Sequence, residues 1–311
     1  PARSDTCPFC PGNETATPPE IFAFRQEGTS PNTVGWWVRG VPNKYPALTW
    51  EPTVEPSASG IFTVQPAKGA HEVVIETPLH NASPGTMSGP EMAEVVRAYI
   101  QRYQALSAIK DIRYVLIFRN HGKEAGASLE HPHSQIAAVP IVPPVILEEL
   151  AGAGRYYEST GRCVFCDLIS QELESGARVV VDTPSFVALE PHASKVPFET
   201  WVLPKVHAAS FDQLEQGQRL ELGSVLTGVL GALDRGLHDP PYNYILHTAP
   251  PNRPCDSFYH WHFEIFPKLT VAAGFEFGMG IYINVTTPEA AADFLRKCVR
   301  DGPAGGRNHG V

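Results

Sequence analysis

Apolar and polar positions alternate in short stretches along the chain. In the first half they predict strands, then a helix, then further strands, and the second half repeats this order. The clearest signal is a helix from Ser88 to about residue 108, because Ser88 and Glu91 form a capping box in which each side chain accepts a backbone N–H of the other residue. Apolar stretches around this helix predict strands near 61–64, 72–76 and 114–119, and from about 130 to 139.

The second half predicts the same order. A helix is expected after Ser210, with Gln213 at the reciprocal capping position. Strands are expected near 179–181, 200–203, 242–247 and 260–266. We therefore predict an α+β fold of two related units, each with an antiparallel sheet and helices packed against it.

A proline-rich stretch over 139–144 lies between the two halves. Proline lacks the N–H that a central strand must donate, so this stretch should end sheet pairing and act as a linker. The predicted units are residues 1–145 and 146–311.

The two halves also repeat a set of histidines and cysteines. The ten residues from His71 to His80 align without a gap to the ten residues that end at His207, and each segment leads to a His-x-His pair. Each half opens with Cys-x-Phe-Cys. Four Cys and His ligands are typical of structural zinc, so two sites are predicted: Cys7, Cys10, His80 and His131, and Cys163, Cys166, His207 and His260.

Composition narrows the class. The 311 residues are 43% hydrophobic and 18% charged, which fits a globular protein, and the net charge of −9 argues against a nucleic-acid or membrane surface. No apolar stretch approaches membrane-spanning length and no signal peptide is visible. A cytoplasmic protein is therefore expected, in which cysteine pairs bind metal rather than form disulfides.

The segment from Glu130 to Gln135 carries the candidate chemistry. Alternate side chains of an extended segment share a face, so His131, His133 and Gln135 project together. If His131 binds a metal, His133 remains free to attack phosphorus, and Gln135 can donate to an oxygen on which charge develops.

The run from Asn120 to Gln135, which includes Ser128 and His133, resembles the active-site segment of the galactose-1-phosphate uridylyltransferase family, a duplicated branch of the histidine-triad superfamily. The resemblance begins at Cys7-Pro-Phe-Cys10 and reaches Gly274-Phe275-Glu276. It implies a ping-pong reaction on a nucleoside diphosphate sugar, in which His133 takes the nucleotide and a sugar 1-phosphate or phosphate later accepts it.

The resemblance also implies roles for further residues. His131 becomes the zinc ligand beside the nucleophile. The other expected positions are Gln135 and Ser128 at the phosphate oxygens, Asn120 at the nucleotide phosphates, Asn43 near the ribose or base, and Phe275 and Glu276 at the sugar. A homodimer is expected, in which Phe275 and Glu276 of one chain face His133 of the other.

Several features resemble the plant-type branch of the family, in which ADP-glucose phosphorylase activity is known. They are Ser134, the second cysteine pair and the segment 274–284. Uridylyl transfer to a hexose 1-phosphate is the family's usual reaction, and adenylyl transfer to phosphate is the alternative. Water as the acceptor, as in small histidine-triad hydrolases, and a non-enzymatic nucleotide-binding module stay open.

The second metal site has an alternative ligand set. Some relatives use the equivalents of His247, His260 and His262 with a glutamate, for which Glu148 or Glu149 is available. The cysteine pair favours the set with Cys163 and Cys166, and a closed set of four ligands predicts a structural role for both zincs. His262 repeats the position of His133, but Glu264 stands in place of Gln135 and would repel an anion.

Overall fold

The two halves of the chain build one continuous antiparallel sheet. The computed structural model describes residues 3–300, and within them ten strands pair in the order β1-β2-β5-β7-β6-β11-β12-β10-β9-β8. The strands of the first half are β1 (Phe22–Arg25), β2 (Trp36–Pro42), β5 (Ala70–Ile75), β6 (Tyr114–His121) and β7 (His133–Val139). Those of the second half are β8 (Val179–Asp182), β9 (Phe186–Leu189), β10 (Thr200–Pro204), β11 (Tyr242–His247) and β12 (His262–Pro267).

The sequence repeat reappears in this strand order. The run β5-β7-β6 in the first half mirrors β10-β12-β11 in the second, and β6 pairs antiparallel with β11 where the halves meet. The predicted α+β class and antiparallel pairing are confirmed, but the two expected sheets are one. Pairing β6 with β11 satisfies backbone groups that two separate sheets would leave open at their edges.

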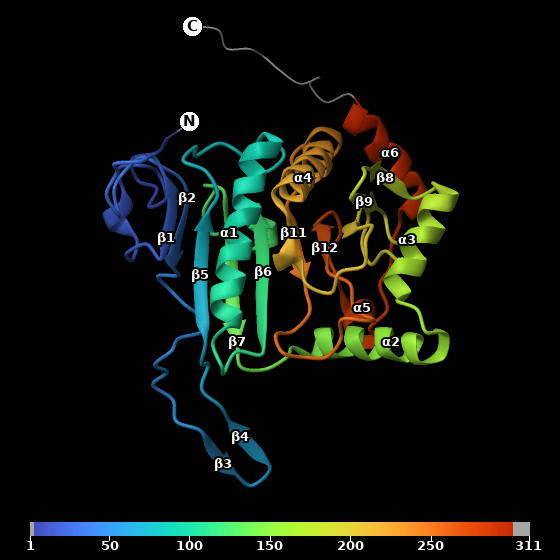
Figure 1. Ribbon diagram of the computed structural model, residues 1–311, viewed down its shortest axis with the longest axis horizontal. Helices are drawn as coiled ribbons and strands as arrows, with labels where there is room; N and C mark the ends of the chain where they lie inside the picture. The colour runs from blue at the N-terminus through green and yellow to red at the C-terminus, as the bar shows by residue number, and fades with distance from the viewer. Residues whose placement is uncertain (1–2, 301–311) are drawn as a thin grey trace, which may run out of the picture.

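Helices α1 (Gly89–Ser107) and α4 (Gln216–Leu237) lie side by side over one face of the sheet, as Figure 1 shows. The close approach depends on Gly223, because a Cβ at that position would lie 2.4 Å from the Gly89 carbonyl oxygen. Together the two helices and the sheet enclose the largest apolar core of the molecule. None of the helices in residues 3–300 has the length and apolar character needed to cross a membrane.

Local signals predicted α1 well and α4 less well. The Ser88–Glu91 capping box is present at the start of α1. The helix expected after Ser210 begins later, because Ser210 donates to the Asp212 carboxylate and only a 3₁₀ turn, η3 (Phe211–Gln213), follows. The capping contact belongs instead to Gln218, whose side-chain oxygen accepts from the Glu215 N–H at 3.0 Å.

Some elements were not predicted. The proline-rich stretch ends β7 as expected, but it leads directly into α2 (Pro144–Thr160), followed by α3 (Val164–Ser175). The strand expected near 61–64 lies outside the main sheet: β4 (Phe62–Val64) pairs with β3 (Ser57–Ser59) in a hairpin that projects from the body (Figure 1). The remaining elements are η1 (Glu14–Ala16), η2 (Lys123–Ala125), α5 (Gly274–Met279) and α6 (Pro288–Arg300).

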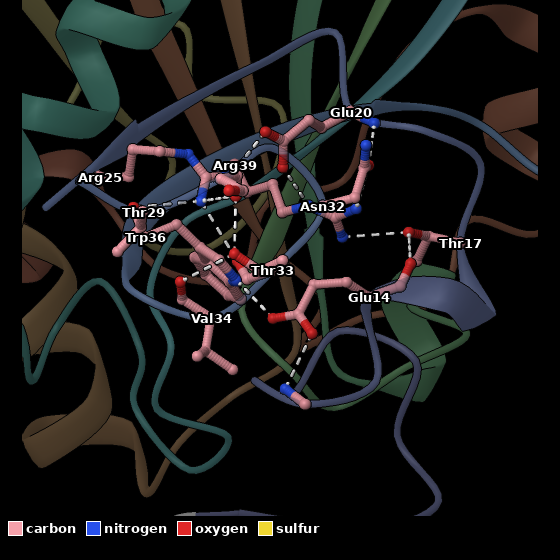
Figure 2. Close-up of polar contacts among 12 residues, drawn as sticks. Glu14, Thr17, Glu20, Arg25, Thr29, Asn32, Thr33, Val34, Trp36 and Arg39 are labelled. Atoms are coloured by element: carbon pink, nitrogen blue, oxygen red, sulfur yellow. Dashed lines mark hydrogen bonds and ion pairs between the residues drawn. The ribbon is translucent and has the colours of Figure 1, made fainter. Parts of the chain in front are cut away.

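A polar network fastens the N-terminal segment to β2 (Figure 2). The Glu14 carboxylate accepts from the Trp36 indole N–H at 2.9 Å and from the Gly12 backbone N–H at 3.0 Å. The buried Arg39 guanidinium donates to Glu20 at 3.0 Å. The contacts of Glu14 fix the segment that directly follows Cys7 and Cys10 against β2.

Candidate functional site

The first cysteine and histidine set comes together at the end of the sheet. The ligand atoms of Cys7, Cys10, His80 and His131 all lie within 4.8 Å of one another. Cys10 Sγ is 3.4 Å from His80 Nδ1 and 3.6 Å from His131 Nδ1. Tetrahedral zinc with ordinary Zn–S and Zn–N bonds places such atoms about 3.6 Å apart, so this donor set fits the ion.

The environment of His131 prepares it to be a ligand. Its Nε2 donates to the Thr77 carbonyl at 2.8 Å, which turns Nδ1 toward the cysteines. Burial lowers the pKa of His131 to about 4, so the ring is neutral near pH 7. A neutral imidazole held by a carbonyl is the form that binds a metal.

The second set repeats this arrangement. The ligand atoms of Cys163, Cys166, His207 and His260 also lie within 4.8 Å of one another. Cys166 Sγ is 3.3 Å from His207 Nδ1 and 3.7 Å from His260 Nδ1, and His260 Nε2 donates to the carbonyl of Pro204 at 2.8 Å. The structure thus groups His260 with the cysteines, as the sequence favoured.

His133 lines two cavities, and no group of residues 3–300 forms a hydrogen bond with its Nε2. Its Nδ1 lies 2.8 Å from the His131 carbonyl oxygen, which can only accept, so Nδ1 carries the proton and Nε2 carries the lone pair. Burial lowers the pKa of His133, which keeps the ring neutral. Phe9 packs edge-on against the imidazole, with ring centroids 5.3 Å apart. A neutral imidazole with its lone pair on Nε2 is the protonation state that a nitrogen nucleophile needs.

Two cavities meet at His133. A cavity of about 380 Å³ is lined by His133, Gln135, Asn43, Tyr45 and Ser128, among others. A larger one, of about 940 Å³, shares His133 and Ser128 and extends along the loop that contains Asn120. The positions predicted at the nucleotide and its phosphates therefore surround one imidazole.

The loop between β6 and β7 contains Gly126, and Asn243 from the second half of the chain holds it in place. Gly126 has φ +89°, a conformation that side chains disfavour. Asn243 of β11 donates to Asn120 Oδ1 at 2.8 Å and to the Ala125 carbonyl at 2.9 Å. Sequence reasoning missed Asn243, whose role arises because it pairs with Asn120 across the join between the two half-sheets.

A buried polar network lies behind His133, on the helix side of the sheet. Arg119 pairs with the Glu76 carboxylate and donates to the His133 carbonyl at 3.2 Å. Tyr99 of α1 donates to Ser134 at 2.8 Å and lies 3.3 Å from Glu76. Because Ser134 faces α1, its neighbours His133 and Gln135 must point to the opposite face, where the cavities lie.

The equivalent position in the second half is closed to anions. His262 Nε2 lies 3.5 Å from a Glu149 oxygen and 3.6 Å from a Glu264 oxygen, and Trp201 stacks on the ring. Burial opposes ionisation of Glu264, but His262 and His247 lower its pKa to about 2. Two carboxylates therefore lie beside His262 Nε2, and their negative charge would repel a phosphate.

The alternative ligand set also exists in part. Atoms of Glu149, His247 and His262 lie within 4.8 Å of one another, as a third group separate from the cysteine site. Glu149 comes from α2, the helix that the sequence did not predict.

Phe275 and Glu276 lie apart from His133 within the chain. Both belong to α5, where Phe275 is half exposed and Glu276 Oε2 accepts from the Ala273 N–H at 2.9 Å. Neither residue lines the cavities beside His133. The predicted contact of these two residues with a sugar beside His133 is therefore not formed within one chain.

Comparisons with known proteins agree with this fold. Residues 1–143 match the description "Galactose-1-phosphate uridyl transferase, N-terminal domain", and residues 149–298 match the corresponding C-terminal domain. The chain is 35% identical to the ADP-glucose phosphorylase of Arabidopsis thaliana, over 95% of this chain and 82% of that protein. It is 34% identical to the galactose-1-phosphate uridylyltransferase of Thermotoga maritima, over 82% of each.

A solved structure gives the same result. The crystal structure of the Arabidopsis thaliana ADP-glucose phosphorylase with bound ADP-glucose is 33% identical, covers 95% of this chain and 92% of that one, and has a TM-score of 0.82. Fold and relatives together define a nucleotidyltransferase. The chain belongs to the galactose-1-phosphate uridylyltransferase family.

Proposed function

We propose that this enzyme transfers a nucleotidyl group from a nucleoside diphosphate sugar to a phosphate-bearing acceptor through a covalent bond to His133. The observation that carries the proposal is the free Nε2 of His133, which lies where two cavities meet. We assign the nucleoside to the smaller cavity, which Asn43 lines, and the remaining phosphate and sugar to the larger cavity. A two-substrate exchange at a single nucleophile needs room for both parts.

The transfer takes two displacements. His133 Nε2 attacks the α-phosphorus, the bond from that phosphorus to the bridging oxygen breaks, and a sugar 1-phosphate leaves with the electron pair. The Nδ1–H bond to the His131 carbonyl stabilises the charge that the ring then carries. Gln135 and Ser128 donate to the phosphoryl oxygens. An oxygen of the acceptor phosphate attacks in the second displacement and returns the electron pair to Nε2.

The donor is one of two. Uridylyl transfer between hexose 1-phosphates is the reaction for which the family is named. Adenylyl transfer from an ADP-sugar to phosphate is the second candidate, and the 35% identity to an ADP-glucose phosphorylase over 95% of the chain favours it.

Zinc would be held by the two Cys₂His₂ sets and would act as a structural ion that fixes the fold around each set. In the first half, Cys7, Cys10 and His80 would share the ion with His131, and the His131 carbonyl in turn orients His133. The reaction steps need only the protein groups named above.

A homodimer would complete the sugar subsite. The segment 269–285 exposes large apolar side chains, namely Leu269, Val271, Phe275, Phe277, Met279, Ile281, Tyr282, Ile283 and Val285. Such a surface favours burial against another chain. In the proposed dimer, Phe275 and Glu276 approach the partner's larger cavity. Analytical ultracentrifugation tests this, and a monomer at micromolar concentration with full activity would contradict it.

The decisive test is intact-protein mass spectrometry after separate incubation with UDP-glucose and ADP-glucose. A uridylyl or adenylyl adduct is expected with one donor, and it should be lost in His133→Ala but kept in His192→Ala, which alters an exposed histidine. Addition of galactose 1-phosphate or phosphate should discharge the adduct faster than water does. Absence of any adduct would contradict covalent transfer, and equal discharge by water alone would indicate a hydrolase.

A further inference from the structure

His71 has no role in the reaction described so far, yet it touches the group that donates to the phosphate. It lies on β5, beside the strand that carries His133 and Gln135. Its Nε2 is 2.8 Å from Gln135 Oε1. Val73 pairs with Gln135 across the two strands, so His71 is the diagonal neighbour of Gln135 on the same face of the sheet.

A backbone N–H group shows which partner donates in the hydrogen bond between His71 and Gln135. The Ala47 N–H donates to His71 Nδ1 at 3.0 Å, and an amide N–H cannot accept. The lone pair of the ring is therefore on Nδ1, and the neutral imidazole carries its proton on Nε2. His71 consequently donates to Gln135, and the atom that receives the bond is the amide oxygen.

A second donor converges on the same oxygen. The Tyr45 N–H donates to Asn43 Oδ1 at 2.9 Å, so the Asn43 amide turns its NH₂ group the other way, to 3.3 Å from His71 Nε2 and 3.5 Å from Gln135 Oε1. Because His71 Nε2 carries a proton, only Gln135 Oε1 can accept from this group. Two backbone N–H groups of one short loop thus orient two side chains, and both side chains hold the oxygen of Gln135.

The remaining end of the Gln135 amide faces the cavity. In residues 3–300 no protein group accepts from Gln135 Nε2, and Gln135 lines the smaller cavity together with His133. The terminal torsion of a glutamine is broad and nearly two-fold, so little in the side chain itself selects this orientation. Reversed, the amide would turn its oxygen toward an anionic phosphoryl group and repel it.

We propose that His71 is a positioning residue for nucleotidyl transfer, which holds the Gln135 amide with its NH₂ group toward the transferring phosphoryl. This inference rests on the proposed function, because it assigns His71 a part in the same reaction. His71 acts only through Gln135. Removing it should therefore slow the chemical step and leave nucleotide binding nearly unchanged.

A double-mutant cycle on the rate of adduct formation tests the role. We expect Gln135→Ala to slow single-turnover formation about 100-fold, as loss of one donor to a developing charge does elsewhere. His71→Ala should slow it about tenfold, which corresponds to an amide that is reversed for about nine-tenths of the time. In the Gln135→Ala background, His71→Ala should cause no further loss. Independent, multiplying effects would overturn the proposal.

Three controls separate positioning from general damage. His71→Gln keeps an N–H donor near the position of Nε2 and should recover most of the rate. His192→Ala should match the wild type. Melting temperatures report whether His71→Ala is folded, and rates are compared only at temperatures well below the transition.

A spectroscopic readout stands apart from activity. In protein with ¹⁵N-labelled glutamine side chains, the Gln135 NH₂ signals should move in His71→Ala and stay in place in His192→Ala, with no nucleotide present. Unchanged signals would overturn the contact, whether or not the enzyme is active. If the signals move in His71→Ala but the wild-type protein forms no adduct, the proposed function and the catalytic part of this inference are overturned, while the contact itself stands.

Discussion

Replacement of Glu76 by glutamine should destabilise the protein strongly and slow the reaction. The Glu76 and Arg119 side chains are 0% and 2% exposed, and they form an ion pair behind His133. Removing one partner of a buried pair leaves an uncompensated charge, at a cost of about 3–5 kcal/mol. For a chain of this size that corresponds to a fall of roughly 10 °C in melting temperature.

The matched control is an exposed pair of the same type. Lys68 and Asp111 lie 3.2 Å apart with side chains 44% and 62% exposed, so Asp111→Asn should change stability by less than about 1 kcal/mol. Urea unfolding followed by tryptophan fluorescence compares the two variants. The double variant Glu76→Leu/Arg119→Leu removes both charges and should be less destabilised than Glu76→Gln. Equal stability of Glu76→Gln and Asp111→Asn would refute the reasoning.

Three further outcomes are expected. Elemental analysis should find about two zinc ions per wild-type chain and about one in either Cys10→Ser or Cys166→Ser. Adduct formation should fall further in Cys10→Ser, because its metal set includes His131, the neighbour of His133. Equal activity in the two variants would contradict this assignment. Glu264→Gln should not create a second adduct by mass spectrometry, because Glu149 still faces His262, and two nucleotides per chain would sink this reading of the second half. Burial raises the pKa of Glu190 well above its ordinary value, so the contribution of this group to the stability of the folded state falls as pH rises, and Glu190→Gln should raise the melting temperature more at pH 8 than at pH 5; a pH-independent difference would count against it.

The elements that the sequence predicted correctly are those with local causes. The capping box at Ser88 is complete within four residues, and it marks the start of α1 wherever that helix packs. The antiparallel strands around the histidines follow from alternation along each segment. The start of α4 was misplaced because the Ser210 hydroxyl donates to the Asp212 carboxylate instead of capping the helix, and sequence spacing alone does not reveal this hydrogen bond.

Features that depend on pairing between distant segments could not be predicted. The single sheet arises from contact between β6 and β11, and neither strand alone shows which edge it will join. His133 and Gln135 stand out as a motif, whereas His71 and Asn243 gain their roles from strand register. Glu149 is a similar case, since α2 follows a proline stretch that resembles a linker and places its carboxylate beside a histidine about a hundred residues away.

The pairing of β6 with β11 has an evolutionary meaning. Were two identical polypeptides to associate in this way, every substitution would appear in both, and replacing the glutamine beside one reactive histidine would disable its twin as well. Within one polypeptide the two copies mutate separately, so Glu264 can arise on one side while Gln135 stays on the other. Covalent connection also keeps the copies together at any dilution, with an effective concentration on the order of millimolar or more. Fusion of this kind would allow a symmetric pair of catalysts to become one catalyst and one scaffold, which is the division that we propose for the two halves of this chain.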